Sequence, residues 1–277
     1  MSAMTSLRLS QLTVGYARGA VVDGIDLELP DGGITAIIGV NGSGKSTLLK
    51  TIARILRPAR GAVLLDGKDI HRLPTREVAR SIAILAQDPP VPAGLTVRDL
   101  VSFGRSPHQR GLRRAGPADA RMIDWAMTET GVAGLADQPV DQLSGGQRQR
   151  AWIAMAIAQD APVILLDEPT TFLDIAHQIE ILELLGRLTR EAGRTVVMVV
   201  HDINHALAHA DHVLILDQGR IAAAGPPGKV ITADLIRDVF HVHAHVAARP
   251  GTGQLHCVPY ALVDEHGSAP LTGLRPQ

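Results

Sequence analysis

A glycine-rich segment at residues 39–46 limits the folds open to this chain more than any other part of the sequence. It reads Gly-Val-Asn-Gly-Ser-Gly-Lys-Ser and fits the pattern G-x-x-x-x-G-K-[ST]. In that pattern backbone amides surround phosphate oxygens, the lysine reaches the β- and γ-phosphates, and the hydroxyl ligates Mg²⁺. The segment follows the apolar run Ile34–Ile38 and precedes a helix expected from about Lys45 to Leu56. The sequence therefore predicts an α/β fold that binds a nucleotide. The expected binding residues are Gly39, Val40, Asn41, Gly42, Ser43, Gly44, Lys45, Ser46 and Thr47.

Composition and charge exclude several other classes of protein. Among the 277 residues, 27 Lys and Arg face 28 Asp and Glu, which gives a formal net charge of −1, and aromatic residues make up 3%. A nucleic-acid partner is therefore not expected, because such proteins usually carry basic surfaces and stacking aromatics. The single cysteine, Cys257, excludes an internal disulfide and a cysteine-based metal cage. The sequence has no apolar run long enough for a membrane span and no signal-peptide core, so an intracellular soluble protein is expected.

The distribution of apolar runs predicts an α/β core with a helical insertion. Strand patterns give way to helical ones from about residue 88 to 162, and another helix is expected at Ile175–Ala192. Residues 261–277 lack periodicity and are expected to form a loose tail. The expected strands are Leu7–Tyr16, Val21–Leu29, Ile34–Ile38, Ala62–Leu65, Ile82–Leu85, Val163–Leu166, Thr195–Val200, Val213–Leu216 and Arg220–Ala224.

Two carboxylates, Asp167 and Glu168, end the apolar run that begins at Val163. Ligands bind at the C-terminal edge of parallel sheets, so this pair is expected near the nucleotide. Asp167 fits an acidic group associated with Mg²⁺, and Glu168 is then placed to orient or deprotonate an attacking water. A solvated turn after a core strand is the alternative, and the loop at 39–46 makes it the weaker one.

A second glycine-containing segment, Leu-Ser-Gly-Gly-Gln at residues 143–147, precedes an apolar helix that ends near Ala158. Ser144 is a natural N-cap, and Gly145 and Gly146 leave backbone amides uncovered, which suits an anion at a helix N-terminus. An ordinary helix cap with a flexible entry is the alternative.

Taken together, residues 39–47, 143–147 and 163–168, with a histidine after the next strand, resemble the ATP-binding subunit of ABC transporters. The resemblance covers about residues 6–260 and implies a P-loop NTPase fold: a RecA-like core, an antiparallel β subdomain, and a helical subdomain inserted at about 88–162. In this family two subunits close head to tail around two ATP molecules. The resemblance therefore implies ATP and Mg²⁺ as cofactors, a second copy of the chain as partner, and contacts to the partner's ATP from Ser144, Gly145, Gly146 and Gln147.

Four further positions carry family roles by resemblance. Tyr16 resembles the aromatic residue that stacks on adenine, and Gln87 resembles the glutamine that touches Mg²⁺ and the attacking water. Asp174 resembles a residue of the loop that crosses between subunits. His201 resembles the histidine that senses the γ-phosphate. The ordinary alternatives are a core tyrosine, a surface glutamine, a helix cap and a histidine of no consequence. Val40 stands where the family usually has proline, a position that contributes mainly backbone. The implied catalytic residues are Lys45, Gln87, Glu168 and His201, and the implied metal-holding residues are Ser46, Gln87 and Asp167.

Four shorter segments are similar to the corresponding segments of the ATP-binding subunits of importers of ferric siderophores, haem and cobalamin. They are residues 96–101, 104–108, 168–178 and 201–204. Ser106 stands where these proteins often carry tyrosine. Since none of these segments touches the cargo, an iron–siderophore complex is expected on family analogy, with cobalamin or haem as alternatives. A non-transport ABC ATPase and a non-enzymatic nucleotide sensor are less favoured. The resemblance implies integral membrane permease subunits as partners, indirectly a substrate-binding protein, and a peripheral location on the cytoplasmic face of the inner membrane. The segment from Gln87 through the helical insertion is the candidate docking surface.

Two sets of histidines have regular spacing. One set falls at i, i+4 and i+8 and the other alternates, so each could share one face of a helix or strand. We expect surface or packing histidines rather than a metal site, because no carboxylate or cysteine completes a known ligand motif. The two sets are His201, His205 and His209, and His241, His243 and His245.

Overall fold

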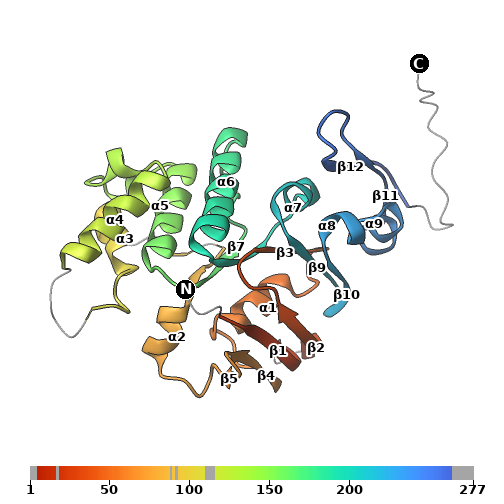
Figure 1. The fold of residues 1–277 in the computed structure, drawn as a ribbon, viewed down its shortest axis with the longest axis horizontal. Coiled ribbons are helices and arrows are strands. Elements are labelled where there is room, and N and C mark those ends of the chain that lie inside the picture. Colours follow the sequence, from red (N-terminus) through yellow and green to blue (C-terminus); the bar gives the residue numbers. More distant parts are fainter. Residues whose placement is uncertain (1–4, 17–18, 88, 91–92, 110–115, 264–277) are drawn as a thin grey trace.

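The protein is described by a computed structural model over residues 5–16, 19–87, 89–90, 93–109 and 116–263. Its centre is a six-stranded sheet with the order β10-β9-β3-β8-β7-β6 (Figure 1). β6, β7, β8, β3 and β9 run parallel, and β10 pairs antiparallel with β9. The bounds are β3 Ile34–Gly39, β6 Ile82–Leu85, β7 Val163–Asp167, β8 Thr195–Val199, β9 His212–Asp217 and β10 Arg220–Gly225.

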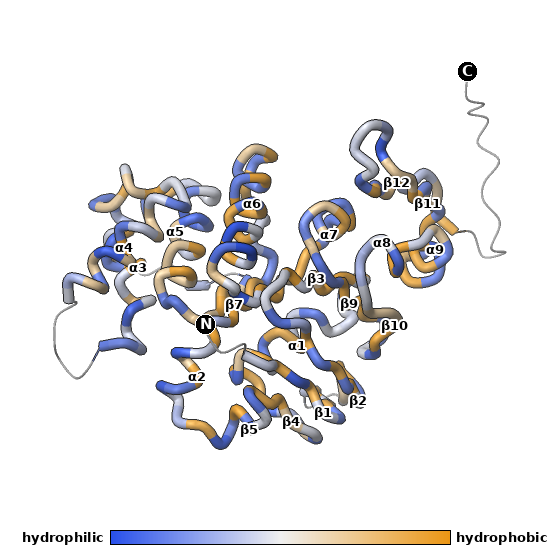
Figure 2. The backbone as a smooth tube through the Cα atoms, viewed as in Figure 1, coloured by the Kyte–Doolittle hydropathy of each residue, from blue (hydrophilic) through white to orange (hydrophobic). Residues whose placement is uncertain are grey.

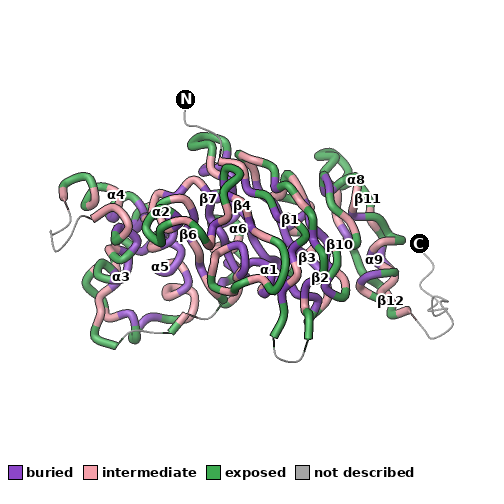
Figure 3. The backbone as a smooth tube through the Cα atoms, turned by 90° about the horizontal axis from the view of Figure 1, so that it is seen from below, coloured by how far each residue is buried: buried purple, intermediate pink, exposed green. Residues whose placement is uncertain are grey.

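Every residue of β3, β7 and β8 is buried. Both faces of this sheet are covered, which is why these strands are apolar throughout instead of alternating. Ala36 and Ile38 of β3 pack in the core on one face, and Ile37 packs in the core on the other. Hydrophobic residues accordingly lie along the central strands (Figure 2), and buried segments run through the middle of the molecule (Figure 3). The expected α/β core is thus confirmed.

A second, antiparallel sheet covers one side of the core. Its order is β2-β1-β4-β5, and α1, Lys45–Ile52, lies between it and the central sheet. Helix α1 is shorter than the expected span to Leu56, because Arg54 adopts the left-handed φ of +62° and ends the turn. The strands are β1 Leu7–Tyr16, β2 Gly19–Leu29, β4 Arg60–Leu65 and β5 Lys68–Asp69.

Helices cover the other face of the central sheet and extend beyond it at one end (Figure 1). The segment expected to be a helical insertion holds α3 (Val97–Phe103), α4 (Pro117–Glu129) and α5 (Gly145–Ala158), with the short turns Ala133–Leu135 and Val140–Gln142. The helices outside that segment are α2 (Thr75–Ser81), α6 (Ile175–Ala192), α7 (Ile203–His209), α8 (Pro227–Val230) and α9 (Ala233–Phe240). Among the described residues, no helix is both long and apolar enough to span a bilayer.

The expected tail boundary at residue 261 is wrong. A hairpin of β11, Val242–Ala248, and β12, Leu255–Leu262, continues through that point. Ala261 pairs with His243 and Leu262 pairs with Val242. Pairing across the chain holds these residues in a strand although their own sequence has no strand periodicity. The hairpin therefore extends beyond residue 260, and the rest of the expected tail, residues 264–277, lies outside the described residues.

Arg105, which follows α3, forms hydrogen bonds to residues of both α4 and α5. It is 7% exposed, its Nε donates to Asp119 Oδ1 at 2.9 Å, and its guanidinium donates to the carbonyl of Ala158 at 2.8 Å. Burial alone would raise the pKa of the Asp119 carboxyl, but hydrogen bonds from Arg105 and the Gly116 amide outweigh it and lower that pKa. The ionised pair therefore stabilises the folded chain.

Replacing Asp119 by asparagine should reduce the free energy of unfolding at pH 7 by at least about 1 kcal/mol, because Arg105 loses its charged partner. A carboxyl with a lowered folded pKa stabilises fully above its ordinary pKa of about 4 and ceases to do so as the pH falls through the folded value. The gap between the parent and Asp119→Asn should therefore close in acid. Calorimetric unfolding at several pH values checks this, with the exposed Asp137→Asn as control. A gap that stays constant down to pH 3 would contradict it.

Candidate functional site

The loop between β3 and α1 has a shape that only glycine allows at two of its positions. Gly39 has φ +149° and Gly44 has φ +103°. A Cβ on Gly39 would lie 2.1 Å from the carbonyl oxygen of Leu216, and one on Gly44 would lie 3.0 Å from that of Val21. The loop therefore stays close to β9 and β2 while its backbone turns into the helix.

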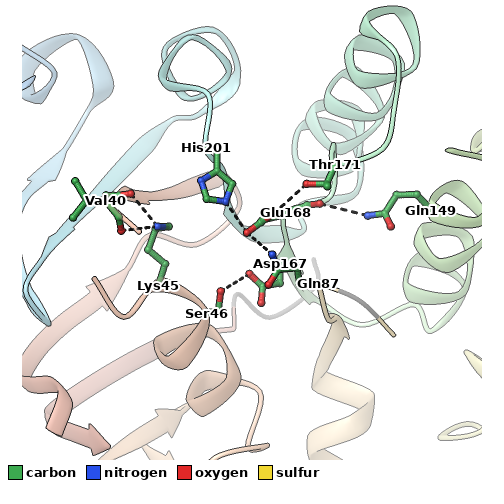
Figure 4. Close-up of polar contacts among 10 residues, drawn as sticks. Val40, Lys45, Ser46, Gln87, Gln149, Asp167, Glu168, Thr171 and His201 are labelled. Atoms are coloured by element: carbon green, nitrogen blue, oxygen red, sulfur yellow. Dashed lines mark hydrogen bonds and ion pairs between the residues drawn. The ribbon is translucent and has the colours of Figure 1, made fainter. Parts of the chain in front are cut away.

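Lys45, the first residue of α1, folds back over this loop (Figure 4). It is 6% exposed, and its Nζ donates to the carbonyls of Gly39 at 2.9 Å and Val40 at 3.0 Å. Burial lowers the pKa of the ammonium group, and the carboxylates of Glu168 and Asp167 partly offset that effect. Phosphate oxygens could replace the two carbonyls as its partners.

A cavity of about 240 Å³ opens above the loop. It lies at the N-terminal turn of α1, and the first backbone amides of a helix have no acceptor within the helix. The cavity is polar on several sides, which suits an anionic ligand. Its lining residues are Val21, Asn41, Gly42, Gly44, Lys45, Ser46, Thr47, Glu168 and His201.

Ser46 and Asp167 meet beside this cavity. The Ser46 hydroxyl donates to Asp167 Oδ1 at 3.0 Å, whereas Oδ2 of the same carboxylate is buried without a hydrogen-bond partner. Burial raises the pKa of Asp167, while the Ser46 hydrogen bond and nearby Lys50 oppose the rise. A buried, unpartnered carboxylate oxygen next to a hydroxyl is a donor set that fits Mg²⁺.

Glu168 is the centre of the polar network in Figure 4. Its Oε1 accepts a hydrogen bond from Gln87 Nε2 at 2.8 Å and lies 2.6 Å from His201 Nε2, which donates when it carries the proton. Its Oε2 accepts from the Thr171 hydroxyl at 3.2 Å. The structure therefore brings together Gln87, Glu168 and His201, three residues that the sequence placed on separate segments.

Sequence reasoning missed two residues of this network, Thr171 and Gln149. Gln149 Nε2 donates to the carbonyl of Pro169 at 3.3 Å and lies 3.5 Å from that of Glu168. A hydroxyl three residues after the glutamate could have been suspected as a turn partner. The sequence gives no comparable indication for Gln149, because Gln149 lies in α5, on a separate segment of the chain.

The 143–147 segment lies at the start of α5, outside the cavity lining. Ser144 Oγ accepts from the Gln147 amide at 3.3 Å, and Gln147 Oε1 accepts from the Ser144 amide at 3.0 Å. Ser144 is therefore confirmed as the N-cap of α5. Contact of Ser144, Gly145, Gly146 and Gln147 with nucleotide stays a prediction.

Asp174 and Tyr16 also lie outside the cavity lining. Asp174 caps α6, since its Oδ1 accepts from the His177 amide at 2.9 Å and lies 2.8 Å from His177 Nδ1, so the helix-cap alternative is confirmed. Those hydrogen bonds lower the pKa of Asp174.

Tyr16 ends β1 and is 55% exposed, so the alternative of a core tyrosine is wrong. The intersubunit role of Asp174 and adenine stacking by Tyr16 stay predictions.

The regularly spaced histidines do not form two common faces. His201 precedes α7, and His241 ends α9 with a left-handed φ of +57° instead of joining the strand. His243 and His245 both stack on Tyr260, whose ring centroid lies 6.1 Å from that of His243 and 4.6 Å from that of His245. In the part of the chain that the structure describes, no three His, Cys, Asp or Glu side chains are placed to hold a metal ion.

Comparisons with known proteins agree with this geometry. The ABC transporter family profile matches residues 22–171, more than half of the chain. The chain is 48% identical over 260 residues to the iron(3+)-hydroxamate import ATP-binding protein FhuC of Bacillus subtilis (strain 168), covering 94% of this chain and 97% of that protein. It is also 48% identical over 257 residues to the ferric enterobactin transport ATP-binding protein FepC of Escherichia coli (strain K12), covering 93% and 95%. A dimeric bacterial ABC transporter cassette superposes with a TM-score of 0.74 at 30% identity, covering 80% of this chain and 98% of that one.

Replacing Lys45 by alanine should weaken ATP binding about tenfold or more, since the buried ammonium group over the loop is lost. Isothermal titration with ATP measures the change. Lys68→Ala serves as control, because Lys68 is exposed on β5 in the other sheet. Equal affinities for the parent and Lys45→Ala would contradict the placement of the triphosphate in the 39–46 loop.

Proposed function

The chain belongs to the ABC transporter family, and from that premise we propose that it is the ATP-hydrolysing subunit of an importer of iron(III)–siderophore complexes. One observation supports the proposed ATP hydrolysis most directly. Glu168 contacts both Gln87 and His201 beside the loop that holds Lys45. The cargo is proposed from relatives named for ferric hydroxamate and ferric enterobactin, which match nearly the full length of the chain.

The site residues divide the work of hydrolysis. The loop amides and Lys45 hold the β- and γ-phosphates of ATP, and Tyr16 stacks on the adenine. Mg²⁺ held by Ser46, Asp167 and Gln87 would neutralise charge on the phosphate oxygens. Glu168 accepts the proton of the water that attacks the γ-phosphorus, and ADP and phosphate leave. His201 donates to the γ-phosphate and keeps it in line.

One chain supplies only part of this enclosure. Residues 144–147 and Asp174 lie outside the cavity that Lys45 and Glu168 line. A second copy arranged head to tail would bring its own residues 144–147 to the exposed side of the triphosphate and exclude water from it. The match to a cassette solved as a dimer supports this assembly.

The partners proposed for transport are integral membrane permease subunits and, through them, a substrate-binding protein. The chain would sit at the cytoplasmic face of the inner membrane as a peripheral subunit. Its docking surface runs from Gln87 through the helical insertion, because Gln87 contacts Glu168 directly and leads into that segment. Nucleotide at the site could then bias the position of the insertion. No nucleic-acid partner is proposed.

Substituting Glu168 by glutamine should leave ATP binding intact and slow hydrolysis by about 10²–10⁴-fold, since the proton acceptor is lost. ATP would then accumulate between two subunits, and light scattering should report a dimer that the parent forms only transiently. Glu180→Gln, an exposed residue of α6, is the control. Hydrolysis at the parent rate by Glu168→Gln would refute the assignment of the water-activating group.

The cargo is tested by uptake in cells that lack this chain. Labelled ferric hydroxamate, ferric catecholate, haem and cobalamin are compared, with complementation by the parent chain and by Lys45→Ala. Loss of ferric siderophore uptake that only the parent restores supports the proposal. Selective loss of haem or cobalamin uptake would replace the cargo, and absence of any transport defect would favour a non-transport ATPase.

A further inference from the structure

Gln149 is a buried polar side chain that none of the roles above uses. It lies one helical turn after Gly145 in α5 and is 5% exposed. Neighbouring buried positions of the helix are mostly apolar, such as Ala151, Trp152 and Ile153. A buried amide costs free energy unless it is hydrogen-bonded, so its partners are informative.

The amide group of Gln149 is directed at the backbone that follows β7 (Figure 4). Its Nε2 donates to the carbonyl of Pro169 at 3.3 Å and lies 3.5 Å from the carbonyl of Glu168. Both carbonyls come after the last residue of β7, where the sheet no longer pairs them. Gln149 therefore supplies a donor where the strand ladder stops.

The backbone at this point has an uncommon conformation. Glu168 has φ +56°, in the left-handed region that residues with a side chain seldom adopt. Such a conformation persists when its surroundings hold it from several sides. The Glu168 amide donates to the carbonyl of Val199 at 3.2 Å on the sheet side, and Gln149 contacts the carbonyls on the helix side. The direction of the Glu168 side chain toward Gln87 and His201 depends on that backbone.

Close packing restricts the same turn further along. A Cβ on Gly146 would lie 3.3 Å from the carbonyl oxygen of Phe172, and one on Gly145 would lie 3.5 Å from the Phe172 Cβ. The first turn of α5 thus packs beside Phe172 and Leu173, and Gln149 adds a directional contact to residues nearer the end of β7.

We propose that Gln149 is a positioning residue for ATP hydrolysis, which holds the backbone of Glu168 in its own chain so that the carboxylate faces the attacking water. The inference rests on the proposed function of Glu168. It predicts a defect in the hydrolysis step and not in the binding of ATP or in closure of the dimer.

The first test is Gln149→Met, which keeps the side-chain length and removes the donor. We expect kcat to fall by about 10–100-fold with KM nearly unchanged, because a catalytic group displaced by about 1 Å loses up to about that much rate. Gln149→Glu keeps the shape, lacks the donor and should lose at least as much. Gln254→Met, on the exposed turn of the β11–β12 hairpin, is the control. An unchanged kcat in both Gln149 variants would overturn the proposal.

The second test separates positioning of Glu168 from support of the 144–147 segment. In a Glu168→Gln background, adding Gln149→Met should leave the ATP-dependent dimer and its ATP affinity unchanged, measured by light scattering and titration. Loss of that dimer, of ATP binding or of the folded state would mean that Gln149 serves the helix or the fold, and would overturn the proposal. If Glu168→Gln alone forms no dimer with ATP, the proposed function fails instead, and the two failures are thereby distinguished.

Discussion

The parallel pairing of β3, β8 and β7 is the constraint on which the site depends. Val199 of β8 pairs with Ile37 of β3 on one side and with Asp167 of β7 on the other. The loop that starts at Gly39 and the carboxylates of 167–168 therefore emerge at the same level of the sheet, one strand apart. His201 follows β8 at that level, and Gln87 follows β6, whose Leu85 pairs with Leu166. The 39–46 loop, Glu168 and His201 line one cavity, and Gln87 hydrogen-bonds to Glu168 beside it, because the register of one sheet fixes where each strand ends.

Burial at this edge gives the site its electrostatic character. Burial lowers the pKa of Lys45 and raises that of Asp167, which means that each charged form loses hydration in the folded chain. Oδ2 of Asp167 lacks a hydrogen-bond partner, and the first amides of a helix such as α1 have no acceptor within the helix. A divalent cation and a polyphosphate could provide these partners. Under the proposed function, part of the binding free energy of MgATP comes from satisfying groups that folding has already desolvated.

The parts that the sequence predicted correctly are those with a local physical signature. Apolar runs such as Val163–Leu166 predict doubly covered strands, and the glycine pattern of residues 39–46 predicts a loop that joins a strand to a helix. The parts that it missed depend on contacts between distant segments. Nothing near Gln149 in sequence indicates that its amide reaches Pro169, and the pairing of Ala261 with His243 is set by the partner strand. Tyr16 is exposed although it ends a strand with a buried face, which periodicity alone could not decide.

The turn after β7 joins two functions that the proposed dimer keeps on different nucleotides. Glu168 faces the cavity of its own chain, while residues 144–147, which lie against Phe172 at the other end of that turn, would face the nucleotide of the partner. The first turn of α5 packs beside Phe172, and Gln149 of the same helix donates to the carbonyl of Pro169 nearer the end of β7. Under the proposed function, Gln149 therefore contributes to the catalytic geometry of its own chain's site, while residues 144–147 of the same helix help to enclose the nucleotide of the partner.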